Sequence, residues 1–270
     1  MSVITSSDAS PLTAAIRAAC SRSGAALIPY ITAGHPSPEL TLPVMRMLAA
    51  EGADVIELGI PFSDPLADGP VIQRSSFEAI AQGADLAWTL RTLAEFRRTS
   101  PVPVVLFTYL NPVIRYGLDA FLADAASAGA QGVLVTDLPL GADPLMERRF
   151  DESSLDLIRL AAPTTAPERI ARIAGAARGF LYYVSRTGVT GAAQSLAEGL
   201  ADEVAHLRGL TELPVAVGFG ISSAEQAAAV ARVADGVVVG SALVDALARG
   251  GLERATALVR ELRSATRLPD

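Results

Sequence analysis

The chain has 270 residues, of which 50% are hydrophobic and 19% are charged, and its formal net charge is −7 at pH 7. This acidic balance argues against a general nucleic-acid surface or a surface for anionic membranes, and no segment approaches the roughly 20 apolar residues that a membrane-spanning helix needs. The length allows one large core, so we expect a single domain over residues 1–270.

Short β-branched runs alternate along the chain with longer stretches that are rich in Ala, Leu and Arg and have the period of a helix. An amphipathic segment, Leu12–Cys20, comes before the first run. Eight runs have the length and composition of strands: Ala26–Thr32, Asp54–Gly59, Val102–Tyr109, Gly132–Thr136, Leu155–Ala161, Gly179–Ser185, Pro214–Gly218 and Gly236–Gly240.

Helical stretches follow these strands, and eight strand–helix units in this length predict a closed parallel (β/α)8 barrel, the TIM barrel. The extra N-terminal helix is expected to cover the barrel floor. An open doubly wound sheet is the alternative, but it usually has about five or six strands and a glycine fingerprint that this sequence lacks. The clearest helical stretches are Glu39–Glu51, Leu118–Ala128, Pro167–Ala177, Ala224–Val233 and Gly251–Ala265.

Three connections that follow strands are long: Ile60–Ser76, Leu110–Gly117 and Arg186–Gly199. The segment after a strand lies on the C-terminal face of a barrel, where active sites of this fold are built. We therefore expect the functional residues on or beside these three connections.

Residue types that are missing or rare restrict the chemistry. All 22 basic side chains are arginine, and without a lysine amine neither Schiff-base aldolase nor pyridoxal phosphate chemistry is open to this chain. The two histidines, His35 and His206, are far apart and no His/Cys cluster has the spacing of a metal site, so we expect no metal and no cofactor. His35 is interpreted as a turn residue. One cysteine, Cys20, and a polar start, Met1–Ser10, suggest a cytoplasmic protein.

Glu57 is the first candidate for catalysis. Strand side chains alternate, so Val55, Glu57 and Gly59 share one face, and a glutamate near the C-terminal end of a strand is expected to point into the barrel mouth. Burial there would raise its pKa and suit it to proton transfer. An ion pair with an arginine, or a place on the rim, is the alternative. The next loop adds Asp64 and Asp68, and the local pattern does not choose between them.

Glycine-rich turns follow the last two predicted strands, in Val217–Ser223 and Val238–Ala242, and Arg186–Gly191 forms a third such segment. Glycine lets backbone amides approach an anion closely, and the helix that follows adds partial positive charge at its N-terminus. Phosphate groups bind at the last two loops of many barrels. The turns therefore predict a phosphorylated substrate.

These residues resemble one family, the α-subunit of tryptophan synthase, an indole-3-glycerol-phosphate lyase. The resemblance extends over nearly the whole chain, and its most specific part is the unbroken segment Glu57–Pro70, ELGIPFSDPLADGP. Supporting matches lie in Pro29–Gly34, Asp137–Pro139, Ser185–Gly191, Gly218–Ser222 and Val239–Ala242.

The resemblance implies a retro-aldol cleavage of indole-3-glycerol phosphate to indole and glyceraldehyde 3-phosphate. It implies that Glu57 moves protons at indole C3 and the glycerol hydroxyl, and that Asp68 binds the indole N–H. Thr190 would lie on a mobile loop that positions the second carboxylate, and Tyr182 would be an active-site tyrosine. The remaining implied contacts are the phosphate-binding amides of Gly191, Gly220, Gly240 and Ser241, and an indole pocket formed by Phe219, Tyr30 and Leu134, for which plain core is the alternative.

The resemblance also implies a partner, a pyridoxal-phosphate β-subunit that receives indole through a tunnel in an α2β2 tetramer. Pro61–Pro65 and Asn111-Pro112 match the face that meets it, so Asp64 is interpreted as a residue of the interface rather than a catalyst. Three alternatives stay open: a stand-alone indole-releasing lyase, another phosphate-binding barrel such as a sugar-phosphate isomerase that uses Glu57 as base, and a chemically silent scaffold.

Overall fold

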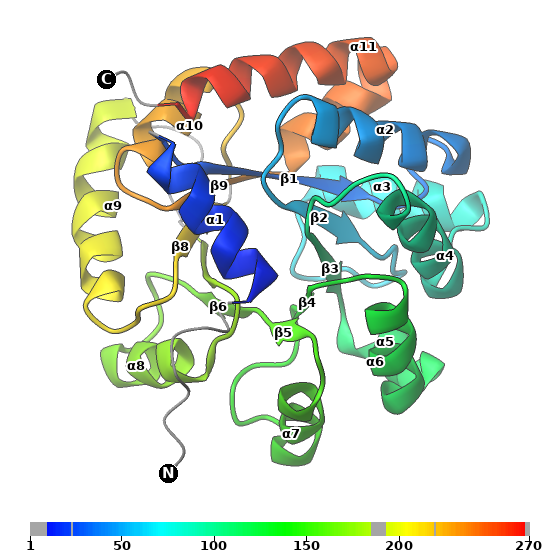
Figure 1. Ribbon diagram of the computed structural model, residues 1–270, viewed down its shortest axis with the longest axis horizontal. Coiled ribbons are helices and arrows are strands. Elements are labelled where there is room, and N and C mark those ends of the chain that lie inside the picture. Colours follow the sequence, from blue (N-terminus) through cyan, green and yellow to red (C-terminus); the bar gives the residue numbers. More distant parts are fainter. Residues whose placement is uncertain (1–9, 23, 185–192, 219, 268–270) are drawn as a thin grey trace.

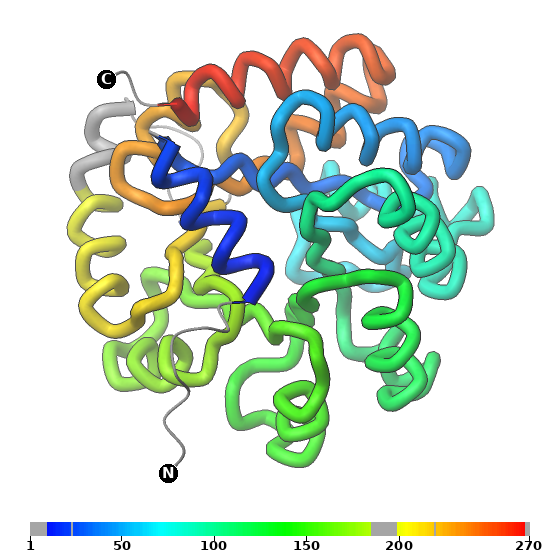
Figure 2. Tube along the Cα trace, viewed as in Figure 1, coloured from blue at the N-terminus to red at the C-terminus, as the bar shows by residue number. Residues whose placement is uncertain are grey.

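A computed structural model describes residues 10–22, 24–184, 193–218 and 220–267. Parallel strands form a ring enclosed by helices, and the chain passes once around it (Figures 1 and 2). Neighbouring strands follow the order β5-β4-β3-β2-β1-β9-β8-β7-β6, which confirms the predicted TIM barrel. The strands are β1 (Ala26–Thr32), β2 (Ile56–Gly59), β3 (Val104–Thr108), β4 (Gly132–Val135), β5 (Asp156–Leu157), β6 (Arg159–Ala161), β7 (Leu181–Val184), β8 (Val215–Gly218) and β9 (Gly236–Val239).

The predicted strand Leu155–Ala161 is divided in the structure. β5 pairs with β4, whereas β6 pairs with β7, and only Ile158 lies between the two short strands. Each half finds its hydrogen-bonding neighbour on one side only, so one of the eight strand positions of the barrel holds two strands.

The helices agree with the predicted alternation, but each of the three long connections is helical over part or nearly all of its described residues. Pro70 begins α3, because a proline is tolerated in the first turn, where its missing N–H needs no acceptor. Residues 110–116, expected as a loop, form α5, and residues 193–199 belong to α9. The helices are α1 (Pro11–Ser21), α2 (Pro38–Ala50), α3 (Pro70–Ala81), α4 (Leu86–Arg97), α5 (Leu110–Tyr116), α6 (Leu118–Ser127), α7 (Pro144–Glu152), α8 (Pro167–Ala176), α9 (Ala193–Arg208), α10 (Ala224–Ala231) and α11 (Ser241–Ala265).

Side chains of each strand alternate between the barrel interior and the surrounding helices. Val55 belongs to the inner cluster with Val105 and Leu134, whereas Ile56 and Leu58 belong to the outer cluster that packs on the helices. This alternation is the one predicted for the strand that carries Glu57. None of the helices in the described ranges is long and apolar enough to cross a membrane.

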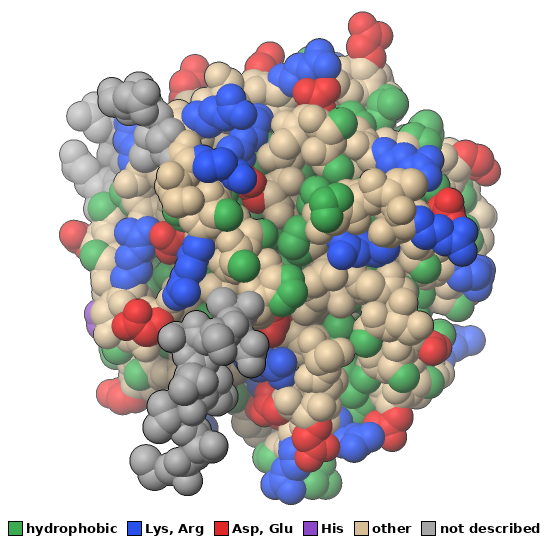
Figure 3. Space-filling model, viewed as in Figure 1, with side chains coloured by type: hydrophobic (Ala, Val, Ile, Leu, Met, Phe, Trp, Pro, Cys, Tyr) green, Lys and Arg blue, Asp and Glu red, His purple; other side chains and the backbone are tan. Residues whose placement is uncertain are grey.

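Helix α1 covers the floor of the barrel, as the sequence predicted, and it lies across the opening of the ring in Figure 1. Leu12, Ile16 and Ala19 are buried and join the inner cluster. The Thr13 hydroxyl donates to the Gly179 carbonyl at 2.6 Å, just before β7. On this face basic, acidic and apolar side chains are interspersed (Figure 3).

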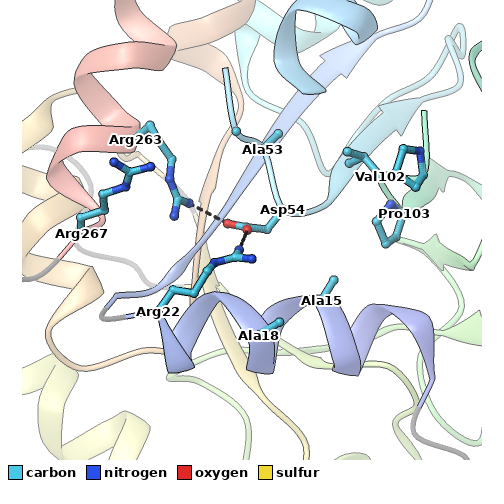
Figure 4. Close-up of a pocket in the computed structure, with 11 residues that line it drawn as sticks. Ala15, Ala18, Arg22, Ala53, Asp54, Val102, Pro103, Arg263 and Arg267 are labelled. Carbon is cyan, nitrogen blue, oxygen red and sulfur yellow. Dashed lines mark hydrogen bonds and ion pairs between the residues drawn. The ribbon is translucent and has the colours of Figure 1, made fainter. Parts of the chain in front are cut away.

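A hollow of about 380 Å³ beside α1 is built around Asp54 (Figure 4). The Asp54 side chain is 7% exposed and accepts hydrogen bonds from Arg22 at 2.8 Å and Arg263 at 2.7 Å. It also accepts from the Leu27 backbone N–H at 2.9 Å. One carboxylate thus joins the end of α1, the entry to β2, the start of β1 and the last turns of α11.

Replacing Asp54 with alanine should lower the free energy of unfolding by about 2–4 kcal/mol, because it strips the poorly exposed Arg263 guanidinium and the Leu27 N–H of their acceptor. Urea unfolding followed by circular dichroism measures this. The matched control is Asp245→Ala, which removes an exposed pair with Arg249 on one helix and should change stability by less than about 0.5 kcal/mol. Equal losses in the two variants would contradict the role given to Asp54.

Candidate active site

Glu57 lies inside the barrel, on β2, with 1% of its surface exposed. Neither of its carboxyl oxygens has a hydrogen-bond partner among the described residues, and no ion pair reaches it there. The predicted alternative of a rim position or an arginine ion pair is therefore wrong within the described ranges. Burial without a partner raises the pKa of Glu57 to about 8. A carboxyl group in this state holds its proton at neutral pH and is poised to give it up.

The buried Glu57 makes stability depend on pH in a definite direction. Its pKa is about 8 in the folded protein, against an ordinary value of 4.5. Between these values the folded state keeps a proton that the unfolded state releases. The stability contributed by the neutral carboxyl is therefore fully present below pH 4.5 and is lost as pH rises through 8.

We expect the free energy of unfolding to fall by about 3–5 kcal/mol between roughly pH 5 and roughly pH 9, relative to the same curve for Glu57→Gln. Urea unfolding of the wild type and of Glu57→Gln at the same series of pH values measures the difference between the two curves. Parallel curves would show that Glu57 ionises in the folded state as an ordinary exposed glutamate does.

Two tyrosines border Glu57 at the barrel mouth. Tyr30 is the register partner of Glu57 across the β1–β2 pair, and a Cβ added at Gly59 would overlap its hydroxyl. A Cβ at Gly218 would likewise overlap the hydroxyl of Tyr182, so each ring lies directly over a glycine of the neighbouring strand. Burial is the main cause that raises the pKa of Tyr182, and the charges of Glu57 and other groups of the site add to it. The Tyr182 hydroxyl therefore stays protonated.

The inner residues of β3 and β4 complete the wall beneath these tyrosines. Phe107, which sequence reasoning missed, packs edge-on against Tyr30 with ring centroids 5.3 Å apart. Leu134 is register partner of Phe107 and fully buried in the inner cluster. The predicted indole-pocket residues Tyr30 and Leu134 are thus on the inner face, and the alternation of β3 is the signal that identifies Phe107.

The structure distinguishes Asp68 from Asp64. The Tyr109 hydroxyl donates to Asp68 Oδ2 at 2.8 Å, and burial raises the pKa of Asp68 while this hydrogen bond opposes the rise. Asp64 is exposed and accepts from the hydroxyl of Ser63 at 2.8 Å. Asp68 also contributes, by its charge, to the raised pKa of Tyr30 and Tyr182, so it faces the same mouth as Glu57.

The turns predicted to bind phosphate lie side by side, because β8 and β9 are hydrogen-bonded neighbours. Gly220 has a φ of +76° after β8, and Gly240 is the N-cap of α11, whose first residue, Ser241, is exposed. A Cβ added at Gly240 would be 3.5 Å from the Tyr30 side chain, which places this turn at the same mouth. The other predicted contacts, Thr190, Gly191 and Phe219, lie outside the described residues.

The described residues include no group of three or more His, Cys, Asp or Glu side chains that could hold a metal ion. His35 is buried, and its Nδ1 lies 3.1 Å from the Glu78 carboxylate. The groups that the structure brings together are therefore two carboxyls of raised pKa, tyrosine hydroxyls and the backbone amides of two glycine turns. Such a site can transfer protons beside a bound anion.

The sequence model of one family, described as the tryptophan synthase alpha chain, matches residues 16–268. The chain belongs to the tryptophan synthase alpha chain family. It is 51% identical over 246 residues to the alpha chain of Xylella fastidiosa (strain 9a5c), which covers 89% of this chain and 92% of that one. It is 49% identical over 241 residues to the alpha chain of Synechococcus elongatus, covering 89% and 91% of the two chains.

Solved structures of tryptophan synthase share the fold. A chain of the Mycobacterium tuberculosis enzyme superimposes with a TM-score of 0.89 at 40% identity, over 97% of this chain and all of that one. The Legionella pneumophila alpha chain does so with a TM-score of 0.87 at 38% identity, over 96% and 98%. The resemblance seen in the sequence is thereby confirmed: this alpha chain is a lyase of tryptophan biosynthesis that cleaves indole-3-glycerol phosphate.

Parts of both segments that were expected to meet a partner subunit line one hollow of about 550 Å³, together with residues 80, 84–87, 115 and 116. Residues 60–63 come from the first segment, and Asn111 and Pro112 of α5 from the second. Leu66, in the loop beyond Pro65, is 89% exposed, which is unusual for a side chain of its size and hydrophobicity. The two predicted segments therefore belong to one continuous surface beside the barrel mouth.

Proposed function

We propose that Glu57 and Asp68 carry out the cleavage of indole-3-glycerol phosphate as a pair with different charges. The observation that carries this proposal is the position of Glu57, a buried carboxyl without a hydrogen-bond partner among the described residues, at the mouth of the barrel. With a pKa of about 8, Glu57 enters the reaction as an acid at neutral pH. Asp68 keeps a hydrogen-bond donor, Tyr109, that favours its charged form.

The two carboxyls then have separate tasks. Glu57 gives its proton to indole C3, and positive charge develops on the indole nitrogen. The Asp68 carboxylate accepts the indole N–H and stabilises that charge. Glu57, now ionised, takes the proton of the glycerol hydroxyl, the carbon–carbon bond breaks, and its electron pair returns to the indole ring. Indole and glyceraldehyde 3-phosphate account for every atom of the substrate, and Glu57 recovers its proton.

The rest of the mouth supports this assignment by holding the two ends of the substrate. Tyr30 and Phe107 offer aromatic surface to the indole, with Leu134 beneath them and Tyr182 at the rim. The amides around Gly220 and at Gly240 and Ser241, at the start of α11, suit the phosphate, because the first N–H groups of a helix have no intrahelical acceptor. We assign Thr190, Gly191 and Phe219 to the same site on the family resemblance alone.

We further propose that this alpha chain docks on a β-subunit through the hollow between residues 60–63 and α5, in an α2β2 tetramer. The shared hollow supports this, as does the exposed apolar side chain of Leu66, three residues beyond Ser63. Because indole is apolar and leaves from the same mouth, a partner seated there is in place to receive it. We infer a cytoplasmic enzyme, since its single cysteine needs no oxidising compartment.

One assay tests the function as a whole. Indole released from indole-3-glycerol phosphate is measured for the alpha chain alone and with a purified β-subunit. We expect release by the alpha chain alone and a faster rate with the partner. No indole in either case would contradict the lyase assignment. A rate that the partner leaves unchanged, with no complex by size-exclusion chromatography, would identify a stand-alone lyase instead.

A further inference from the structure

Tyr109, at the end of β3, contacts the loop that carries Asp68 at three of its residues. Its hydroxyl donates to Asp68 Oδ2 at 2.8 Å and accepts from the backbone N–H of Ala67 at 3.0 Å. Its ring packs against Phe62, with centroids 5.3 Å apart and an interplanar angle of 37°. The side chain is buried, and it holds the loop at two places: the ring contacts Phe62, and the hydroxyl contacts Ala67 and Asp68.

The chemistry of a phenol makes these contacts directional. A hydroxyl has a single hydrogen, and since the Ala67 N–H can only donate and an ionised carboxylate can only accept, that hydrogen goes to Asp68 while a lone pair receives the Ala67 N–H. Burial, together with the charge of Asp68, raises the pKa of Tyr109, so the phenol remains a donor throughout the neutral range. The bond therefore acts on Asp68 in two ways: it fixes the direction of one oxygen and favours the ionised form.

Among the described residues, the side-chain oxygens of Asp68 have no other hydrogen-bond donor. Gln73 binds the backbone carbonyl of Asp68 at 3.0 Å, not its carboxylate. The titratable groups that act electrostatically with Asp68 are Tyr30, Tyr182 and Tyr109, and no described cation adds to them. Without Tyr109, nothing in this part of the chain would oppose the effect of burial on Asp68.

We propose that Tyr109 is a positioning residue of the reaction, whose hydroxyl holds Asp68 in the direction and the charge state in which it meets the indole N–H. The inference rests on the catalytic role proposed above for Asp68. The role of Tyr109 explains how a carboxylate on a loop can have a defined position. Tyr109 directly follows β3, a strand of the barrel, and its contacts hold the loop against the end of that strand.

The test compares Tyr109→Phe, Asp68→Asn and the double variant by the pH dependence of kcat and kcat/KM for indole release. Tyr109→Phe should lower kcat about 10-fold or more near neutral pH and move the acid limb of the profile to higher pH, since a hydrogen bond to a charged group is lost. In the Asp68→Asn background the same change should have less than about a twofold effect, because its target is gone.

The matched control is Tyr183→Phe. Tyr183 lies on the outer face of β7, where its hydroxyl is hydrogen-bonded to Glu203, so the variant loses a tyrosine–carboxylate bond outside the mouth. Its pH profile should match the wild type.

Two results would overturn the inference in distinguishable ways. A Tyr109→Phe profile like the wild type, beside an impaired Asp68→Asn, removes the positioning role and leaves the catalytic proposal standing. Full activity of Asp68→Asn removes the catalytic role of Asp68 and the positioning role with it. Circular dichroism and thermal unfolding of each variant separate these results from misfolding, and the retained ring of Tyr109→Phe keeps its contact with Phe62.

Discussion

Replacing Glu57 with glutamine should lower kcat for indole release by about 10²- to 10⁴-fold, with little change in KM. Glutamine keeps the shape of the side chain but has no acidic proton to give. Among the described residues, only Glu57 has both carboxyl oxygens buried and without a partner, so no other carboxyl can take over the proton transfer to indole C3 or from the glycerol hydroxyl. Steady-state indole release with and without the β-subunit measures the effect. Since the site is buried and the glutamine neutral, the variant should remain folded.

A surface substitution shows whether the loss is specific. Glu95 is half-buried on α4 and pairs with Arg98 at 2.8 Å, so Glu95→Gln makes the same chemical substitution outside the site and should leave kcat unchanged. If Glu57→Gln retained a substantial part of the wild-type kcat, Glu57 could not be the proton donor. The same outcome would revive the alternative of a chemically silent scaffold.

Replacing Asp68 with asparagine should lower kcat about 10²- to 10³-fold, because an amide oxygen accepts the indole N–H but carries no charge to stabilise the cation that develops there. The effect should appear in kcat more than in KM, since the charge is absent from the bound substrate. Asp68→Asn also removes a carboxylate whose pKa is already raised by burial, so folding should be preserved.

Asp64→Asn gives the comparison that the structure calls for. Asp64 is exposed, and its side chain bonds only to Ser63 among the described residues, so losing its charge should leave cleavage by the isolated alpha chain near the wild-type rate. A change confined to the stimulated rate would place Asp64 at the partner surface. Equal losses for the two aspartates in the absence of partner would contradict the separate roles given to them.

Several features could be predicted from the sequence because they depend on local periodicity. The period-2 alternation of the strands put Glu57 on the inner face, and the amphipathic pattern of residues 12–20 placed a helix on the floor. The glycine turns after the last two strands were visible for the same reason: a turn between a strand and a helix has a composition of its own. The same alternation, applied to the strand that holds Phe107, would also have placed this residue on the inner face beside Tyr30.

Other features were decided by contacts between residues far apart in the sequence. Asp64 and Asp68 have the same chemistry and lie close together in the chain. Their physical difference comes from tertiary structure: Asp68 is partly buried and bonded to Tyr109, 41 residues away, whereas Asp64 is exposed. The division of the fifth strand depends on which neighbour each half meets around the ring. The raised pKa of Glu57 requires a closed barrel that excludes water from both carboxyl oxygens. The sequence by itself determined the barrel and the face on which Glu57 lies, because strand periodicity is local. The family resemblance implied Asp68, but only the tertiary structure showed that it is bonded to Tyr109, because a loop takes its conformation from the surfaces against which it packs.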